Sequence, residues 1–241
     1  MKISILTLFP EMFGGAFDHS IIKKAQEKKI LSISYVNIRD FGIGKHRIVD
    51  DTPYGGGAGM VIRVDVIANA LAHATRHTPH ATRRILLDPQ GEKFTQKKAQ
   101  ELSKYDHLIL ICGRYEGVDE RVRKFVDEEI SIGDYVLTGG EIPAMVITDA
   151  VCRLLPDVIK EESPKNESFS NHTLDAKRYT LLEYSQYTRP PIFNGKKVPI
   201  ILTKGDHQKI AGWRNQEALK KTKKKRPDLL QLESGKLIQK R

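Results

Sequence analysis

The sequence predicts an α/β domain in which helices cover both faces of a parallel sheet. Predicted strands and helices alternate from the N-terminus to Pro156, which is the pattern of α/β domains. The strand predicted over 107–113 contains an uninterrupted apolar run, Leu108–Cys112, as strands do when both faces of a parallel sheet are buried. Segment 3–9 alternates and is rich in β-branched residues before Pro10, so it is the first predicted strand.

The remaining elements follow in order along the chain. Apolar residues at helical spacing predict a helix over 13–28, and a second strand is predicted over 30–38. A polar, glycine-rich loop occupies 39–59. Hydrophobic patterning then predicts a helix over 64–74, a strand over 83–88 closed by Pro89, a helix over 96–103, and a helix that begins at Ile142.

The last part of the chain differs in composition from the rest. We expect a catalytic domain over 1–159, a mobile linker over 160–180 that lacks periodicity, and a small, mainly helical domain over 181–241. The net charge is +10, and the segment 196–241 holds 14 Lys and Arg against 4 Asp and Glu. All of the excess charge therefore lies there, which indicates a polyanion-binding module, with a solvated lysine-rich tail as the alternative.

Composition also excludes several classes of protein. Only Cys112 and Cys152 are present, so neither a disulfide framework nor a cysteine-based zinc site can form. No apolar run approaches the roughly 20 residues of a membrane-spanning helix, and the N-terminus does not resemble a signal peptide. We therefore expect a cytoplasmic enzyme that does not bind a membrane.

Three loops that follow hydrophobic runs predict a small-molecule site. They are 87–91, 113–117 and 132–141, and each contains glycine, which allows close approach of backbone to a ligand. The dinucleotide pattern G-x-G-x-x-G does not follow the first strand, and no G-x-x-x-x-G-K-[ST] is present. An ordinary dinucleotide-binding fold and nucleoside triphosphate hydrolysis are therefore disfavoured.

Four segments together resemble bacterial tRNA (guanine-N1)-methyltransferases: 49–60, 112–121, 131–141 and 187–190. The resemblance covers nearly the whole chain, in order and at similar spacing. It implies a SPOUT-type fold with a trefoil knot in the C-terminal part of the catalytic domain. It also implies methyl transfer from S-adenosylmethionine to N1 of the guanine at tRNA position 37, a homodimer with shared active sites, and an assisting magnesium ion. The sequence itself contains no metal-ligand spacing.

The resemblance assigns the three loops to the cofactor pocket. The implied cofactor-binding residues are Leu87, Asp88, Pro89, Gly113, Ile132, Gly133, Asp134, Tyr135, Val136, Leu137, Gly139, Gly140 and Pro143. Recognition by backbone groups explains the frequency of glycine, because a side chain would occupy the volume of the ligand.

The resemblance also implies the catalytic pair. Guanine N1 carries a proton near neutral pH, so a carboxylate must remove it while a cation stabilises charge on the neighbouring carbonyl oxygen. The matching arginine is Arg153, with a surface helix arginine as the alternative. Glu167 stands where the family has aspartate, and its proton affinity is similar. Asp175, in the same linker, is a competing base.

Substrate contacts are implied for Asp50, Tyr115, Glu116, Lys220 and Lys221. Asp50 could instead cap a turn, and Glu116 could cap a helix or form an ion pair. Two other functions stay open: a knotted methyltransferase that acts on another RNA, and an RNA-binding factor without catalysis.

Overall fold

The computed structural model describes residues 1–76, 81–160, 167–174 and 177–230. The chain divides into two compact units, Met1–Ile159 and Lys160–Arg241, and each is described by itself. No helix among the described residues is both long and apolar enough to cross a membrane.

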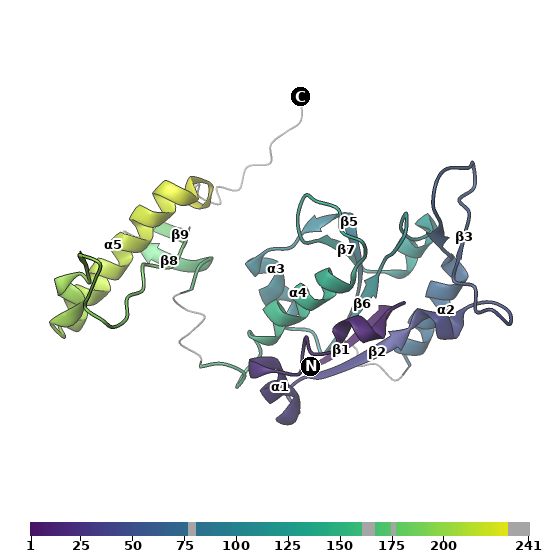
Figure 1. Ribbon diagram of the computed structural model, residues 1–241, viewed down its shortest axis with the longest axis horizontal. Helices are drawn as coiled ribbons and strands as arrows, with labels where there is room; N and C mark the ends of the chain where they lie inside the picture. The colour runs from purple at the N-terminus through teal and green to yellow at the C-terminus, as the bar shows by residue number, and fades with distance from the viewer. Residues whose placement is uncertain (77–80, 161–166, 175–176, 231–241) are drawn as a thin grey trace. The chain divides into compact units, whose positions relative to one another are not determined.

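The first unit is built on a five-stranded sheet in which every neighbouring pair of strands is parallel. The strand order is β2-β1-β6-β5-β7, so β6 is the central strand and has β1 and β5 on its two sides (Figure 1). The five strands are β1 (Lys2–Thr7), β2 (Ser32–Asn37), β5 (Thr82–Lys93), β6 (His107–Cys112) and β7 (Glu128–Ser131). This arrangement confirms the predicted α/β fold with a parallel sheet.

Helices cover both faces of the sheet, as the apolar run in β6 predicted. One face packs against α1 (Ser20–Glu27), α3 (Gln96–Leu102) and α4 (Glu141–Cys152). The other packs against α2 (Val64–Ala74) and short 3-10 helices. Successive residues of β6 enter opposite cores, since Leu108 and Leu110 belong to the first cluster and Ile109 and Ile111 to the second.

The structure corrects the predicted start of the first helix. The helix expected over 13–28 begins only at Ser20, because a 3-10 helix (Pro10–Phe13) and a turn precede it. Gly15 in that turn has φ +81°, a conformation in which a helix cannot continue.

The predicted end of β5 is also wrong. The strand does not stop at Pro89 but resumes its pairing with β7 at Glu92 after a shift in register. At Gly91 an added Cβ would come within 2.5 Å of the Glu129 backbone carbon, so this close passage over β7 requires glycine. The irregular stretch between Leu87 and Glu92 becomes a loop above the sheet.

β7 itself was missed because its first two residues are charged. Glu128 accepts hydrogen bonds from Arg83 Nε (2.8 Å) and Lys98 Nζ (3.0 Å), and Glu129 pairs with Arg123. These cations satisfy the carboxylates at the sheet edge, so the strand does not need an apolar pattern.

The glycine-rich stretch 39–59 contributes one strand to a short two-stranded sheet. In it, β3 (Asp50–Asp51) pairs antiparallel with β4 (Val61–Ile62). Ile62 N donates to Gly117 O at 3.0 Å and Glu116 N donates to Met60 O at 3.1 Å. The stretch is therefore joined to the loop that follows β6.

The second unit combines one long helix with two hairpins. Part of the linker expected over 160–180 lies in an antiparallel hairpin of β8 (Ser170–Leu174) and β9 (Lys177–Leu181). A second hairpin pairs β10 (Ile192–Phe193) with β11 (Lys196–Lys197). The expected basic helix is α5 (His207–Lys225), and Asp206 caps its first turn by accepting from Lys209 N at 3.1 Å.

Acid should destabilise the first unit through His107. This side chain is fully buried at the start of β6 and hydrogen-bonds Ser4 Oγ through Nε2 at 2.9 Å. Burial, with the nearby charge of Lys2, lowers its pKa from 6.5 to about 4. The unfolded chain therefore binds a proton at higher pH than the folded chain does, and the unfolding free energy should fall by about 3 kcal/mol as pH drops from 6.5 to 4.

The measurement is urea unfolding across that pH range. His107→Gln should flatten the dependence on pH, whereas His46→Gln, at an exposed position, should leave it as in the wild type. Equal slopes in all three proteins would contradict the assignment to His107.

Candidate functional site

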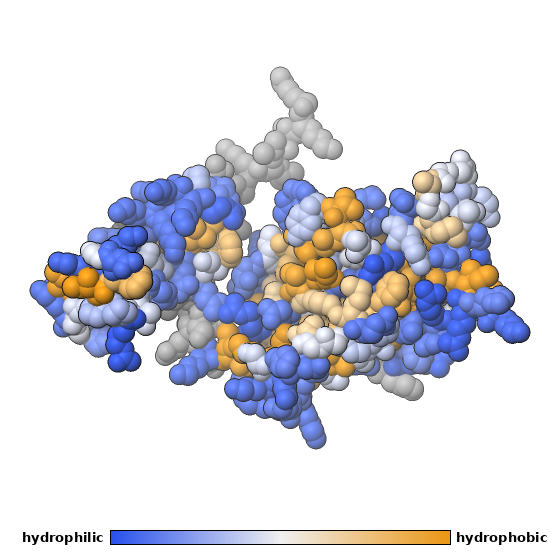
Figure 2. Space-filling model, in the orientation of Figure 1, coloured by the Kyte–Doolittle hydropathy of each residue, from blue (hydrophilic) through white to orange (hydrophobic). Residues whose placement is uncertain are grey.

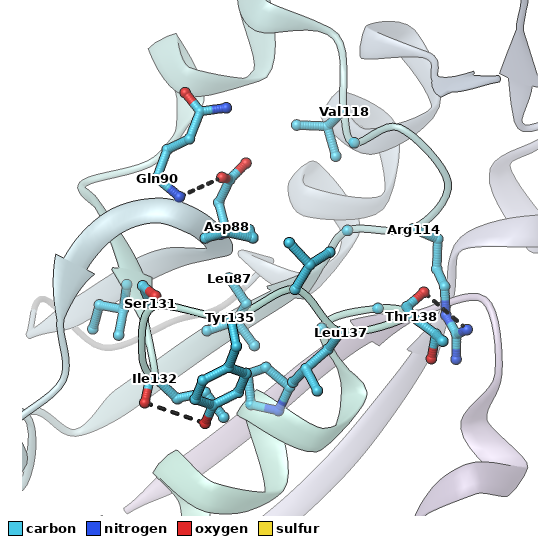
Figure 3. A pocket seen from close by; sticks show the side chains of 18 of the residues that line it. Leu87, Asp88, Gln90, Arg114, Val118, Ser131, Ile132, Tyr135, Leu137 and Thr138 are labelled. Atoms are coloured by element: carbon cyan, nitrogen blue, oxygen red, sulfur yellow. Dashed lines mark hydrogen bonds between the residues drawn. The ribbon is translucent and has the colours of Figure 1, made fainter. Parts of the chain in front are cut away.

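The main cavity of the first unit opens where three adjacent parallel strands end. It has a volume of about 250 Å³ and is lined by residues that follow β5, β6 and β7 (Figure 3). Ligands of α/β proteins bind outside the carboxyl ends of strands, and the volume lies just below the usual range for small-molecule sites, about 300–1,000 Å³.

The structure brings together twelve of the thirteen residues predicted for the cofactor pocket. They line this cavity, and they are Leu87, Asp88, Pro89, Gly113, Ile132, Gly133, Tyr135, Val136, Leu137, Gly139, Gly140 and Pro143. Asp134 is not among the lining residues; its exposed carboxylate pairs with Lys93 Nζ at 2.7 Å.

The predicted site residues did not include several lining residues that lie in the same three loops or directly beside them. They are Gln90, Arg114, Gly117, Val118, Ile130, Ser131 and Thr138. These residues stand beside the predicted glycines in the sequence, and that position could have identified them.

The loop after β7 is shaped by its own hydrogen bonds. Gly133 has φ +154°, and an added Cβ there would lie 2.5 Å from the Tyr135 ring. Tyr135 N donates to Gly133 O at 2.9 Å, and its hydroxyl donates to Ile132 O at 3.4 Å, folding the ring back over the loop (Figure 3). Ser131 Oγ donates to Gly133 O at 3.0 Å. Contacts among residues 131–135 therefore fix the shape of this wall of the cavity.

The same loop is tied to the loop after β6 where α4 begins. Gly140 N donates to Gly113 O at 2.9 Å, and Arg114 and Gly139 form an antiparallel bridge. An added Cβ on Gly140 would lie 2.6 Å from Cys112 Cα. Because that neighbour is backbone at the end of a central strand, it cannot move aside.

Gly140→Ala should therefore disrupt the cavity. Overpacking of this kind costs about 1–3 kcal/mol of stability, and calorimetric titration should show weaker binding of S-adenosylmethionine. Gly212→Ala is the matched control, because an added Cβ on this helical glycine meets no atom within 4 Å, and it should preserve or raise stability. Unchanged cofactor affinity in Gly140→Ala would contradict the proposed role of this close approach.

A buried ion pair joins the cavity wall to the start of α4 and the end of β1. Glu141, 1% exposed, accepts from Arg114 Nε at 3.0 Å and from Thr7 Oγ1 at 2.7 Å. The guanidinium also donates to Thr138 O at 3.2 Å and lies 4.6 Å from the centroid of the Phe9 ring. Arg114 therefore connects β1, the loop after β6 and the loop after β7.

A second arginine orients the carboxylate on the opposite wall. Arg123 donates to Asp88 Oδ2 at 3.2 Å and to Glu120 Oε2 at 2.8 Å. Asp88 Oδ1 accepts from Gln90 N at 2.9 Å, which fixes the turn after Leu87 (Figure 3). The polar side of the cavity is thus set by a hydrogen-bonded carboxylate with little freedom to rotate.

Three of the predicted substrate residues cluster at the mouth of the cavity. Tyr115 and Glu116 line it, and burial together with a hydrogen bond to Asp50 raises the pKa of Tyr115. An added Cβ on Gly59 would lie 2.6 Å from Glu116 Cγ. The glycine cluster 55–59 therefore ends against a residue of the site.

The other predicted site residues lie in separate places. Arg153 is half-buried and directly follows α4 in the first unit, whereas Glu167 belongs to the second unit. Lys220 and Lys221 both lie on α5. Asp175, the competing base, lies outside the described residues.

Two features limit the chemistry of the site. No group of three or more His, Cys, Asp or Glu in the described part of the chain could hold a metal ion. Cys112 is fully buried in the core directly before Gly113, and burial, with the charge of Glu141, raises its pKa well above the ordinary value. The thiol therefore packs as a small apolar group.

The chain was compared with known proteins. The model of the family described as "tRNA (Guanine-1)-methyltransferase TrmD" matches residues 1–232. A tRNA (guanine-N(1)-)-methyltransferase of Geobacillus kaustophilus is 56% identical over 232 residues, covering 95% of this chain and 91% of that protein. Proteins of the same name from Dictyoglomus turgidum (56% identical; 96% and 90% covered) and Bacillus cereus (53%; 96% and 92%) are also similar. The chain therefore belongs to the tRNA (guanine-N1)-methyltransferase family.

Proposed function

We propose that this protein transfers a methyl group from S-adenosylmethionine to N1 of the guanine at position 37 of tRNA. The observation that carries the proposal is the cavity at the ends of β5, β6 and β7, because it gathers the three glycine-containing loops into one small-molecule site. The relatives are named tRNA (guanine-N(1)-)-methyltransferases, which agrees with methylation of guanine N1 in tRNA.

The residues of the cavity fit the methyl donor. An added Cβ on Gly113 would make only ordinary contacts, 3.7 Å from Leu87 O and 3.9 Å from Val118 Cγ1, so this position is open toward a ligand. Apolar side chains such as Leu87 and Leu137 and the free edges of loop backbone offer surfaces for an adenine ring. When bound, the cofactor supplies an electrophilic methyl group on a positively charged sulfur.

The proton on guanine N1 needs an acceptor before N1 can attack. We assign this role to the Glu167 carboxylate, which would take the N1 proton as the N1–methyl bond forms and the sulfur–methyl bond breaks. Arg153 would stabilise the negative charge on the neighbouring carbonyl oxygen. The described residues form no metal cluster, so we assign no step to magnesium.

The target base would enter beside the mouth of the cavity. Tyr115 and Glu116 line the cavity there, with Asp50 hydrogen-bonded to the Tyr115 phenol. Tyr115 is 48% exposed, so its ring is available for stacking on a base.

The second unit would bind the tRNA, in the cytoplasm where tRNA is modified. Its helix α5 carries Lys220 and Lys221 within a run of basic residues that ends at Arg226. Such cations contact phosphates and position the RNA without reading its sequence.

An apolar patch supports a homodimer. Ile142 and Val146, one turn apart on α4, are 45% and 41% exposed, and Val136 before the helix is 85% exposed. Figure 2 shows hydrophobic surface over the position of α4. Exposed apolar patches of this kind mark interaction sites, and a second copy of the chain would cover this patch.

The proposed trefoil knot is supported by the hydrogen bonds between the loops after β6 and β7.

The test is methyl incorporation from labelled S-adenosylmethionine into tRNA transcripts that carry guanine or adenine at position 37, with the product base identified by mass spectrometry. We expect N1-methylguanine only in the first transcript. Methylation of another RNA or of a ribose would replace the proposed substrate. Absence of cofactor binding in a calorimetric titration would favour an RNA-binding factor without catalysis.

A further inference from the structure

A second cavity lies entirely within the second unit and has no role in the reaction described so far. Its volume is about 180 Å³, and it lies, partly open to solvent, between the extended segment 182–184 and one face of α5. Ala211 and Ala218 lie on that face seven residues apart, and Arg214 and Asn215 lie between them. The two small alanines leave room between the helix and the segment.

The walls of this cavity are fixed by buried hydrogen bonds. Leu182 N donates to Thr222 Oγ1 at 2.9 Å, and the fully buried Thr222 donates to Ala218 O at 2.7 Å. Glu183 N donates to Ser168 Oγ at 3.1 Å. These bonds hold the backbone of Leu182 and Glu183 in place at the wall of the cavity.

One wall offers a stacking surface. The Arg214 guanidinium lies over the Tyr184 ring at 4.8 Å from its centroid. Unstacked RNA bases are held by aromatic rings and by the planes of arginine side chains. The pair therefore presents the two kinds of flat surface that bind a base.

The polar residues of the lining fit a base edge. Glu183 Oε1 accepts from Gln186 Nε2 at 2.5 Å, and a carboxylate has about four acceptor positions, so several stay open. Asn215 offers both a donor and an acceptor. Guanine fits such a lining. Its Watson–Crick edge carries two adjacent donors, N1–H and N2–H, which can both donate to one carboxylate. The oxygen next to them can accept a hydrogen bond from an amide.

We propose that this cavity binds one unstacked guanine of the RNA substrate, distinct from the guanine that is methylated. The methylated base must face the methyl donor, whereas residues of the second unit alone line this cavity. The lysines of α5 supply the phosphate contacts that would bring RNA to it. The inference rests on the proposed function, since it takes tRNA as the partner.

The experiment measures tRNA affinity of the full-length protein by fluorescence anisotropy at several salt concentrations. Tyr184→Leu should weaken binding by about 5- to 100-fold, the range of base–aromatic stacking. The slope of log affinity against log salt should stay unchanged, because no phosphate contact is lost. Glu183→Gln should weaken binding by about 10-fold, and Glu217→Gln, the same charge change at a residue of α5 outside the lining, should not.

The identity of the base is tested with transcripts in which inosine, which lacks the N2 amine, replaces single guanines. One replacement should weaken binding to the wild type and have no further effect in Glu183→Gln. If Tyr184→Leu lowers the melting temperature of the protein, Asn215→Ala takes its place.

Three results would overturn the inference: wild-type affinity in every cavity variant, a salt slope reduced by about one, or no single inosine position that matters. Guanosine monophosphate that shifts the Asn215 amide resonance, with tRNA affinity unaffected by the variants, would assign the cavity to a free nucleotide instead of RNA. If the wild-type protein methylates guanine 37 but the cavity variants bind tRNA normally, this inference is rejected and the proposed function stands.

Discussion

Replacing Arg114 by leucine is expected to lower the free energy of unfolding by about 3–5 kcal/mol, because it leaves a buried carboxylate without its cation. Glu141 is 1% exposed, while the side chain of Arg114 is 15% exposed. Leucine would also remove the hydrogen bond from the guanidinium to Thr138 O. Since that bond ties the loop after β7 to the loop after β6, affinity for S-adenosylmethionine should fall as well.

Chemical denaturation and calorimetric titration provide the two measurements. Arg121→Leu is the control: it breaks an exposed ion pair with Asp119, in which the arginine is 63% exposed, and should change stability by less than about 1 kcal/mol. The double variant Arg114→Leu/Glu141→Leu should recover part of the lost stability, because no unpaired charge is then buried. Equal stability of Arg114→Leu and Arg121→Leu would show that the pair contributes little.

Glu167→Gln is expected to reduce the single-turnover rate of tRNA methylation by about 10²–10⁴-fold, because the amide cannot accept the N1 proton. Affinity for S-adenosylmethionine should be unchanged, since Glu167 does not line the cavity. The measurement is rapid-quench methyl transfer with saturating tRNA and cofactor.

Glu27→Gln serves as the control for charge, because Glu27 forms an exposed pair with Lys23 away from the cavity, and its rate should match the wild type. Glu167→Asp should keep most of the activity, because it preserves the carboxylate. Near-normal rates in Glu167→Gln would reject Glu167 as the base and direct attention to Asp175.

The sequence predicted those parts of the fold that depend on local patterning. The apolar run of β6 correctly indicated a strand buried on both faces, and the spacing of α2 and α3 gave their limits to within a residue. β7 was missed because Glu128 and Glu129 are satisfied by cations from other elements. The continuation of β5 beyond Pro89 was missed for a similar reason, since the approach of Gly91 to β7 is a tertiary contact.

The same difference between local patterns and long-range contacts applies to the site. Its glycines were visible in the sequence, because the backbone conformations they permit leave a local signature. The arginine network was not, because Arg114 and Arg123 contact residues far away in the chain: Glu141 is 27 positions from Arg114, and Asp88 is 35 positions from Arg123. Glu167 was found from the resemblance alone, and no pattern in its own segment marks it.

The burial of Cys112 has one more consequence. A bound S-adenosylmethionine would keep an alkylating agent close to this sulfur at every catalytic cycle. Thiolates attack such carbon centres readily and protonated thiols do so poorly, and burial raises the pKa of Cys112 well above its ordinary value. We therefore expect the buried Cys112 thiol to stay protonated and to react slowly with a methyl donor bound in the cavity.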